Sequence, residues 1–165
     1  MRLKLEVATA KDAADLVALR AAVNQRLMAQ YGNGYWAAGL TEKGALFAMR
    51  TSTVYVARAG GRLIATLALS TRKPWAIDKK YFSASQRPLY LTSMAVAPGR
   101  QRKGIGRLCV DEARRIAAQW PADAIRLDAF DAEAGAGGFY SKCGFREVGR
   151  AAYRNVPLIY FEMLV

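Results

Sequence analysis

The segment Gln101 to Gly106 reads Gln-Arg-Lys-Gly-Ile-Gly, a composition typical of an anion-binding turn. It follows the apolar, β-favouring run 89–96 and precedes a stripe of apolar residues at helical spacing that begins at Ile105. A turn between a strand and a helix points free backbone N–H groups outward at the positive end of the helix dipole. Gly104 and Gly106 carry no side chain that would keep an anion away from those donors. Four cations surround the turn: Arg100, Arg102, Lys103 and Arg107. The segment is therefore predicted to bind phosphate, with a diphosphate as the expected ligand.

A second candidate segment, 139–145, reads Phe-Tyr-Ser-Lys-Cys-Gly-Phe. Gly144 is predicted to end a short helix in the left-handed conformation, with Phe145 starting a strand in the core. Tyr140 then lies one turn before the helix end, where its hydroxyl could point into a cleft between strands. The alternative is a tyrosine that packs by its ring and leaves its hydroxyl in water.

The elements that must position these two segments alternate between strand and helix. Strands are expected at 3–7, 54–58, 63–70, 89–96, 124–130, 145–148 and 158–163. Helices are expected after Thr9, whose spacing to Asp12 resembles a capping box, at 41–49, after Gly104 and before Cys143. Residues 71–88 show no clean period and are predicted to form a long irregular loop, a kind of segment that is often functional. The order indicates one mixed α/β domain, residues 1–165, built around a single sheet.

Composition and charge narrow the classes of function. The chain has 165 residues with 25 basic against 13 acidic side chains, a formal net charge of +12. This balance favours polyanionic partners, and a phosphorylated coenzyme, an RNA and a merely solvated surface all fit. The basic residues are scattered along the chain and show no RNA-reading aromatic motif, so nucleic acid is not the favoured partner.

The chain contains no histidine and two cysteines. This removes the usual neutral-pH general base, the His-containing triads and, in practice, a structural zinc site, so no metal is expected. Cys109 falls on the apolar stripe of the central helix and is interpreted as a core residue. No apolar run approaches the length of a bilayer span and the N-terminal residues lack a secretory pattern, so a cytoplasmic location and no membrane partner are expected.

Taken together, the two segments resemble the GNAT superfamily of acyl-CoA-dependent N-acetyltransferases. The resemblance runs from the Leu3 strand to the Phe161 strand. It is most specific at Met94-Ala95-Val96 with Gln101-x-x-Gly104-x-Gly106, and at Phe139-Tyr140-x-Lys142-x-Gly144-Phe145. It implies an α/β fold with a mostly antiparallel central sheet of about six or seven strands, flanked by about four helices.

The resemblance also implies roles for matching positions, with acetyl-CoA as co-substrate. The backbone of Met94, Ala95 and Val96 would pair with the pantetheine arm as if it were an added strand. Tyr140 would protonate the departing thiolate as general acid, and the amide of Val96 or its neighbour would polarise the thioester oxygen. The coenzyme pyrophosphate would lie on the turn formed by Gln101, Arg102, Lys103, Gly104, Ile105, Gly106 and Arg107.

Two departures from the family pattern concern carboxylates and glycines. Glu133 stands where many members have Asn, and the strand 89–96 lacks the Glu that some members use as base. The candidate general bases are Asp128, Asp131, Glu133 and a chain of water molecules. An amine that loses its proton before binding would need no general base. Of the carboxylates, Asp128 is taken as the candidate catalytic residue. Gly135, Gly137 and Gly138 each cost up to about 1 kcal/mol in a helix interior, so the short helix is predicted to be weakly formed without coenzyme.

For the acceptor, a pocket with aromatic walls and one carboxylate is expected. Its predicted aromatic members are Tyr31, Tyr35, Trp36, Trp75, Tyr81 and Phe82, and Asp78 is expected to pair with a substrate ammonium group. The alternative is that Trp75 and Phe82 anchor the long loop against the core. The expected acceptor is a small amine or amino acid. Two alternative functions are a non-catalytic acyl-CoA sensor and an RNA-directed acetyltransferase. The oligomeric state is also open, and a homodimer is one possibility.

Overall fold

The computed structural model describes residues 2–165, which contain a seven-stranded sheet in the order β1-β2-β3-β4-β5-β7-β6. All neighbouring strands pair antiparallel except β4 and β5, which are parallel. This confirms the expected mixed, mostly antiparallel sheet. The strands are β1 (Glu6–Val7), β2 (Thr53–Ala59), β3 (Arg62–Ser70), β4 (Pro88–Val96), β5 (Ala124–Phe130), β6 (Arg146–Tyr153) and β7 (Val156–Leu164).

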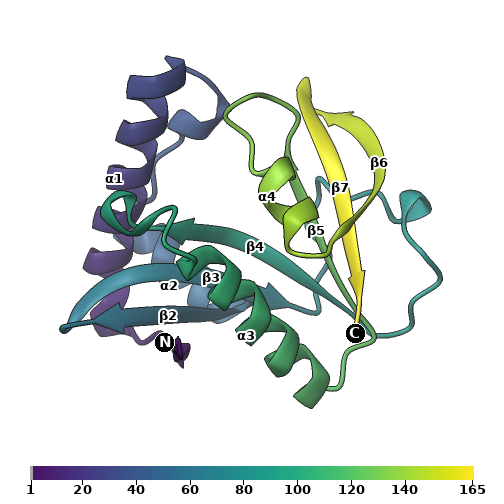
Figure 1. The fold of residues 1–165 in the computed structure, drawn as a ribbon, viewed down its shortest axis with the longest axis horizontal. Coiled ribbons are helices and arrows are strands. Elements are labelled where there is room, and N and C mark those ends of the chain that lie inside the picture. The colour runs from purple at the N-terminus through teal and green to yellow at the C-terminus, as the bar shows by residue number, and fades with distance from the viewer. Residues whose placement is uncertain (1) are drawn as a thin grey trace.

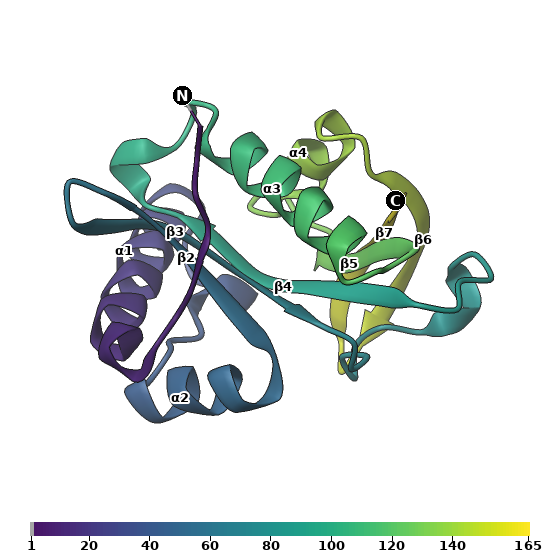
Figure 2. The same cartoon turned by 90° about the horizontal axis from the view of Figure 1, so that it is seen from below.

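Two helices cover each face of the sheet (Figure 2). The helices α1 (Ala13–Tyr31) and α2 (Glu42–Thr51) lie on one face, and α3 (Ile105–Gln119) and α4 (Gly137–Lys142) lie on the other. The main core lies under α3 and α4, where Cys109, Val110, Ala113 and Ala117 of α3 are fully buried against the sheet. A smaller apolar cluster joins α1 and α2 to β2 and β3.

Local sequence signals account for most element boundaries. The backbone N–H of Thr9 donates to the Asp12 carboxylate at 2.8 Å, completing the predicted capping box ahead of α1. Thr41 caps α2 through its hydroxyl, which accepts from the Gly44 N–H at 3.0 Å. The prediction was too long for β1, which starts at Glu6, and too short for β6, which continues to Tyr153.

The centre of the sheet is split. β4 pairs with β5 through three positions only, Pro88 with Ala124, Leu89 with Ile125 and Tyr90 with Arg126. Beyond Tyr90 the two strands diverge, as Figure 1 shows, although both continue for several residues. On its other edge β4 stays paired with β3, and the register shifts where Ser93 and Met94 face a single residue of β3. Ser93 has φ 54°, so this β-bulge turns the strand locally next to the split.

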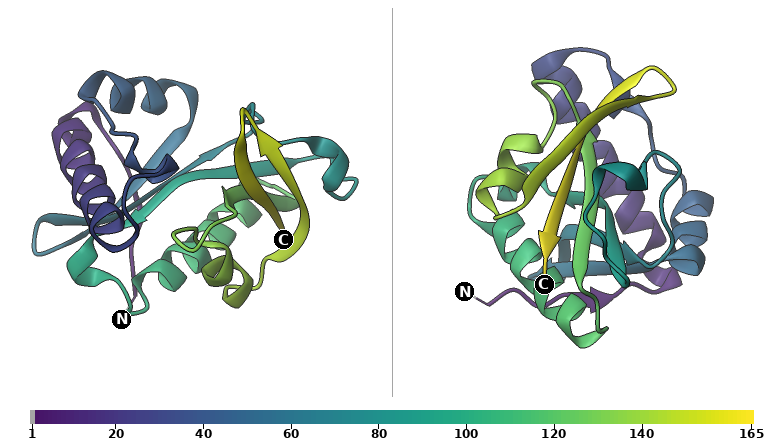
Figure 3. Two further views of the ribbon diagram at one scale, coloured as in Figure 1. Left: turned by 90° about the horizontal axis from the view of Figure 1, so that it is seen from above. Right: turned by 90° about the vertical axis from the view of Figure 1, so that its right-hand side faces the viewer.

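The long segment between β3 and β4 projects from one end of the sheet (Figure 3). It contains one short 3-10 turn, Lys79–Tyr81, and is otherwise irregular, as predicted. Ile77 is buried, and the Tyr160 hydroxyl donates to the Ala76 carbonyl. Further along, the Glu162 carboxylate accepts the Ser83 N–H at 3.2 Å. These contacts fix the segment to the β5–β7 half of the sheet.

Among residues 2–165, no helix combines the length and apolar character that a membrane crossing requires.

Candidate active site

The inner edge of β4 is the first part of the site. The Ala97 N–H donates to the Ile64 carbonyl on β3 at 2.8 Å. Because the backbone groups of successive strand residues point to alternate edges, the Val96 N–H faces away from β3, toward the split. The Val96 carbonyl on that edge accepts from the Gln101 side-chain amide at 3.0 Å. Gln101 thus holds the corner between β4 and the turn, and the strand edge keeps donors available for an extended ligand.

The N-terminus of α3 is the second part. Gly104 is the N-cap residue, with φ 80° in the left-handed region, and it contributes no side-chain cap. The first intrahelical bond runs from the Leu108 N–H to the Gly104 carbonyl at 3.1 Å. The N–H groups before Leu108 therefore lack acceptors within the helix. A Cβ on Gly104 would meet no atom within 4 Å, so the turn is open on this side. This geometry suits an anion at the helix start.

Gly106 has a packing role that the sequence did not indicate. A Cβ at this position would lie 3.0 Å from two atoms of the Phe139 ring. Gly106 therefore permits the close approach of α3 and α4, and its role toward an anion stays a prediction. Two of the predicted cations are also engaged by protein carbonyls: Lys103 Nζ donates to Gly99 at 3.0 Å and Arg107 to Lys142 at 2.7 Å. Ile105 is buried, so it offers a ligand only its backbone.

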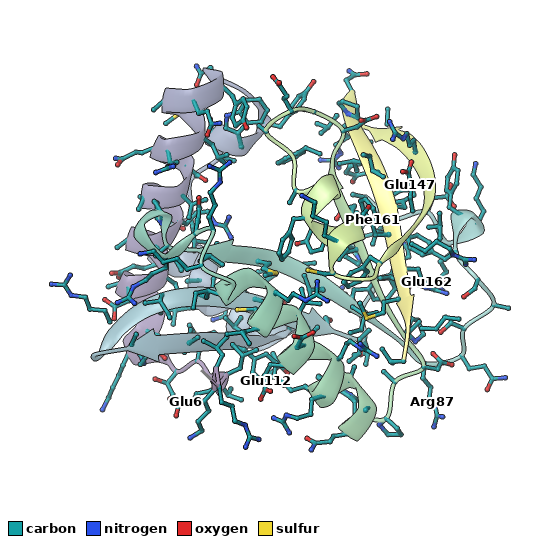
Figure 4. The ribbon with its side chains drawn as sticks, in the orientation of Figure 1. Glu6, Arg87, Glu112, Glu147, Phe161 and Glu162 are labelled. Carbon is teal, nitrogen blue, oxygen red and sulfur yellow. The ribbon has the colours of Figure 1, made fainter. Side chains whose placement is uncertain are left out.

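Tyr140 lies in α4 on the opposite side of the split from α1. Its ring packs against Phe139, Phe145 and Phe161, with centroid distances of 5.2, 5.6 and 6.0 Å. Phe161 on β7 lies beside α4 in Figure 4. Burial raises the pKa of Tyr140, the charge of Asp128 raises it further, and the charge of Arg20 lowers it. The phenol is therefore protonated at neutral pH, as a proton donor must be.

Asp128 is the candidate catalytic carboxylate, and its charge adds to burial in raising the pKa of Tyr140. It lies on β5 beyond the last pair with β4, opposite Tyr160 of β7. Burial raises the pKa of Asp128, which makes its carboxylate a stronger base than a free one. Asp131 is engaged instead with Arg150 at 3.3 Å, and Glu133 is exposed. Among residues 2–165, no three His, Cys, Asp or Glu side chains gather as metal ligands would.

An aromatic cluster borders the outer end of the split. Tyr31 and Trp36 meet edge to face at 6.2 Å, and Tyr35 contacts both Trp36 at 6.4 Å and Phe130 at the end of β5 at 5.9 Å. The structure therefore brings together Tyr31 and Trp36, which lie at the end of α1 and just after it. Tyr35, also among the predicted aromatic residues, contacts both Trp36 and Phe130 and so links the end of α1 to β5.

The other predicted acceptor residues lie elsewhere, on the segment between β3 and β4: Trp75, Asp78, Tyr81 and Phe82. Phe82 packs against Tyr160 at 5.4 Å and under the Arg126 guanidinium at 5.0 Å, so it anchors the segment as the alternative stated. Asp78 caps the 3-10 turn through the Lys80 N–H at 3.1 Å. Trp75 is 85% exposed and does not anchor anything. The structure therefore does not gather the predicted residues into one pocket, because the long loop packs on the β5–β7 half of the sheet.

The helix α4 also differs from the expectation. Gly135 lies outside it, in a tight turn where a Cβ would overlap the Phe130 carbonyl oxygen. Gly137 is the first helical residue, and its Cβ position faces Ile159 and Phe161 at 3.4 Å. Only Gly138 stands in the helix without a packing reason. The glycines therefore serve the turn and the packing more than they weaken a helix.

Two residues near the split were missed from the sequence: Arg20 and Ser93. Arg20 on α1 donates to the Ser93 carbonyl at 3.0 Å. The available signal was that Arg20 interrupts the edge of the apolar stripe formed by Leu16, Leu19 and Val23. The bulge at Ser93 has no comparable signal, because it depends on the pairing of β4 with β3.

The chain is thus an α/β protein in which a split sheet leaves the edge of β4 open beside a helix N-terminus that has no side-chain cap. Such a geometry suits an extended anionic ligand. A family model described as acetyltransferase (GNAT) family matches residues 20–145. The chain therefore belongs to the GNAT family of acetyltransferases.

Solved structures share the fold over nearly the whole chain. A GNAT-family acetyltransferase from Listeria monocytogenes aligns with a TM-score of 0.75 at 14% identity, covering 99% of this chain and 95% of that one. The ribosomal-protein-S18-alanine N-acetyltransferase from Escherichia coli gives 0.73 at 14% identity, covering 98% and 93%. The PaiA N-acetyltransferase from Thermoplasma acidophilum, solved with coenzyme A, gives 0.71 at 15% identity, covering 97% and 98%. Among curated proteins the chain has no match.

Proposed function

We propose that this protein transfers an acetyl group from acetyl-CoA to the primary amine of a small or amino-acid-like molecule. One observation carries the proposal: the unpaired inner edge of β4 leads directly to the uncapped N-terminus of α3. An extended pantetheine arm would add to β4 as a strand does. The diphosphate at its end would then meet the open backbone amides of residues 102–107.

The residues present fit this ligand. The strand edge offers the Val96 N–H, and the bulge at Ser93 and Met94 interrupts the ladder where the arm would end. Gly104 leaves the helix start open. Arg100 and Arg102 are exposed beside it and supply positive charge. Ala95 turns its side chain away, toward Leu19 and Val23 of α1, so only its backbone belongs to the site.

The chemistry proposed for the site is direct attack. The amine nitrogen bonds to the acetyl carbonyl carbon, the carbon–sulfur bond breaks, and the sulfur takes the proton that Tyr140 holds. Asp128 accepts the proton that the amine loses. Burial raises the pKa of Tyr140, and the same burial would raise the basicity of a thiolate formed beside it, so the two remain matched.

The acceptor would enter past the aromatic cluster of Tyr31, Tyr35 and Trp36. This cluster faces Phe130 at the end of β5, and the Tyr35 hydroxyl reaches the Asn155 carbonyl at 3.5 Å. It therefore spans from α1 to the turn between β6 and β7. Trp75, Asp78 and Phe82 are not part of this proposal.

The test is thiol release from acetyl-CoA across a panel of primary amines. We expect release above the amine-free rate with at least one small amine and a product heavier by one acetyl group. The protein's own thiols do not interfere, because Cys109 is fully buried with a pKa raised to about 12 and Cys143 is buried as well. Tight acetyl-CoA binding without release for any amine would favour the non-catalytic sensor instead.

A further inference from the structure

Arg20 is a charged group at the split that the proposed chemistry does not use. It lies on α1, partly buried, and one guanidinium nitrogen donates to the Ser93 carbonyl at 3.0 Å. Burial lowers the pKa of Arg20, so its environment disfavours the positive charge. The Ser93 carbonyl accepts from one of the five N–H donors of the Arg20 guanidinium and does not neutralise its positive charge.

Two arginines on strands of the sheet, Arg126 and Arg58, are each paired with a carboxylate. Arg126 donates to the Glu162 carboxylate at 2.9 Å, and Arg58 pairs with Asp12. In residues 2–165 no carboxylate oxygen lies within 4.0 Å of the Arg20 guanidinium. Because a charge withdrawn from water is usually paired, Arg20 stands out as a cation that lacks its anion.

A cavity lies beside this guanidinium. Its volume is about 100 Å³, room for a few small polar groups. Thr92, Ser93 and Arg20 form its polar side, while Ala45 and Ala48 of α2 close it from the apolar side.

The cavity adjoins the reacting region. Ser93 belongs to the bulge at which the β4 ladder is interrupted, and the charge of Arg20 acts on Tyr140 across the split. A ligand group held by Arg20 would therefore lie beside the bulge of β4, within electrostatic reach of the proposed general acid. An amine carried one carbon away from that group would point toward the same place.

We propose that Arg20 binds the carboxylate of the acceptor, and that the acceptor is an α-amino acid. The inference rests on the proposed function and specifies its substrate class. A carboxylate fits because the guanidinium fork can donate two parallel N–H bonds to its two oxygens. The small cavity and the Thr92 hydroxyl suit a group of this size.

The experiment compares each standard amino acid with its carboxamide in the thiol-release assay. We expect kcat/KM to be at least about tenfold higher for the best acid than for its amide, the worth of a charged hydrogen bond. The amide has the less basic amine and hence more free base at neutral pH, so amine basicity cannot produce this preference. Arg20→Gln should lower kcat/KM for the acid about tenfold or more and leave the amide within about threefold.

Matched variants separate recognition from support of the fold. Arg26→Gln, an exposed arginine on the same helix, should leave the acid-to-amide ratio unchanged. Arg20→Lys should retain part of the preference, because it keeps the charge without the fork. Ala48→Leu, which narrows the cavity from α2, should lower kcat/KM for the acid while the charge stays in place.

Calorimetric binding of the same amino acids to the protein–coenzyme A complex provides a readout that needs no turnover. Binding that Arg20→Gln removes, with acetyl-CoA affinity unchanged, supports the inference even if no amine is acetylated, an outcome that would reject only the proposed function. Acetylation without preference for acids would reject the inference and keep the proposed function. Equal loss of acid turnover, amide turnover and acetyl-CoA affinity in Arg20→Gln would show that Arg20 merely supports the bulge.

Discussion

Tyr140 has a buried ring, and charges on both sides of the split sheet, those of Asp128 and Arg20, affect the pKa of its hydroxyl. Three phenylalanine rings fix its position, so removing the hydroxyl alone should leave the packing intact. Tyr140→Phe is expected to lower kcat by about 10²-fold, the lower range for a lost general acid. Thiol release measures this loss.

The control for Tyr140→Phe is the calorimetric Kd for acetyl-CoA, which should remain within about twofold because the hydroxyl contributes to proton transfer and not to the diphosphate. Wild-type thiol release in this variant would reject Tyr140 as the acid.

Asp128 carries a pH signature with a defined sign. Burial raises the pKa of Asp128 above that of an unfolded aspartate, about 3.9, so the folded protein holds this proton more tightly. Ionised Asp128 therefore destabilises the fold once the pH exceeds the unfolded value. Asp128→Asn should raise Tm at pH 7 and lose this advantage as the pH falls toward 4, measured by calorimetric scans.

The same variant should lose turnover at neutral pH if Asp128 is the base. Asp131→Asn is the matched control, because Asp131 is paired with Arg150 and should show no such gain in Tm. A stability gain in Asp128→Asn that grows as the pH falls would contradict the assigned direction.

The start of α3 makes its own prediction. Gly104 has φ 80°, so any side chain there costs some strain, and Asn tolerates this conformation best. Gly104→Glu adds a negative charge to that strain, directly at the open amides. We expect its acetyl-CoA affinity to fall at least about hundredfold, while Gly104→Asn falls far less. Calorimetric titration separates the two, and equal affinities would reject the diphosphate site.

The turn before α4 offers a matched pair of glycines. A Cβ on Gly135 would overlap the Phe130 carbonyl oxygen, whereas one on Gly138 would meet nothing within 4 Å. Gly135→Ala should therefore lower the free energy of unfolding by about 1–3 kcal/mol, the cost of overpacking. Gly138→Ala should raise it by about 0.5–1 kcal/mol, because alanine favours the helix. Urea denaturation measures both changes in the free energy of unfolding. A change of the same sign in the two variants would contradict the prediction.

Features that depend on neighbouring residues were predicted from the sequence, whereas features that depend on distant residues were not. The Thr9–Asp12 box acts within a few residues and was predicted correctly, and the helix expected at 41–49 is found as α2, which begins at Glu42 after its Thr41 cap. The direction in which the segment 71–87 folds depends on Glu162, which is distant in sequence and holds the Ser83 N–H. Pattern reasoning could not know this pairing, so Trp75, Asp78 and Phe82 were assigned to the wrong place.

Across the whole molecule, Arg126 and Glu162 hold the second half of the sheet to the long segment. The Arg126 guanidinium donates to Glu162 on β7 at 2.9 Å, to the Ser83 carbonyl at 2.7 Å and to the Tyr90 hydroxyl on β4 at 3.3 Å. Figure 4 shows Glu162 at the β7 strand that faces this segment. Arg126→Met would remove the close partner of the buried Glu162 carboxylate and leave only the Arg146 guanidinium, at 3.9 Å. It should cost about 3–5 kcal/mol of unfolding free energy.

The control for Arg126→Met is Arg150→Met, which removes an exposed arginine paired with Glu147 at 2.6 Å and should cost no more than about 1 kcal/mol. If the two variants lost the same free energy of unfolding in urea denaturation, the buried pair of Arg126 and Glu162 would stabilise the fold no more than the exposed pair.

Three rungs between β4 and β5 also mean that the two halves of the sheet can respond separately to heat. A thioester lying along β4 would contact both halves at once, so its binding free energy would stabilise both halves against thermal unfolding. At a ligand concentration 100 times Kd this amounts to about 2.7 kcal/mol. Melting curves recorded with and without acetyl-CoA should therefore differ in sharpness as well as in midpoint, because ligation makes two loosely joined units melt as one.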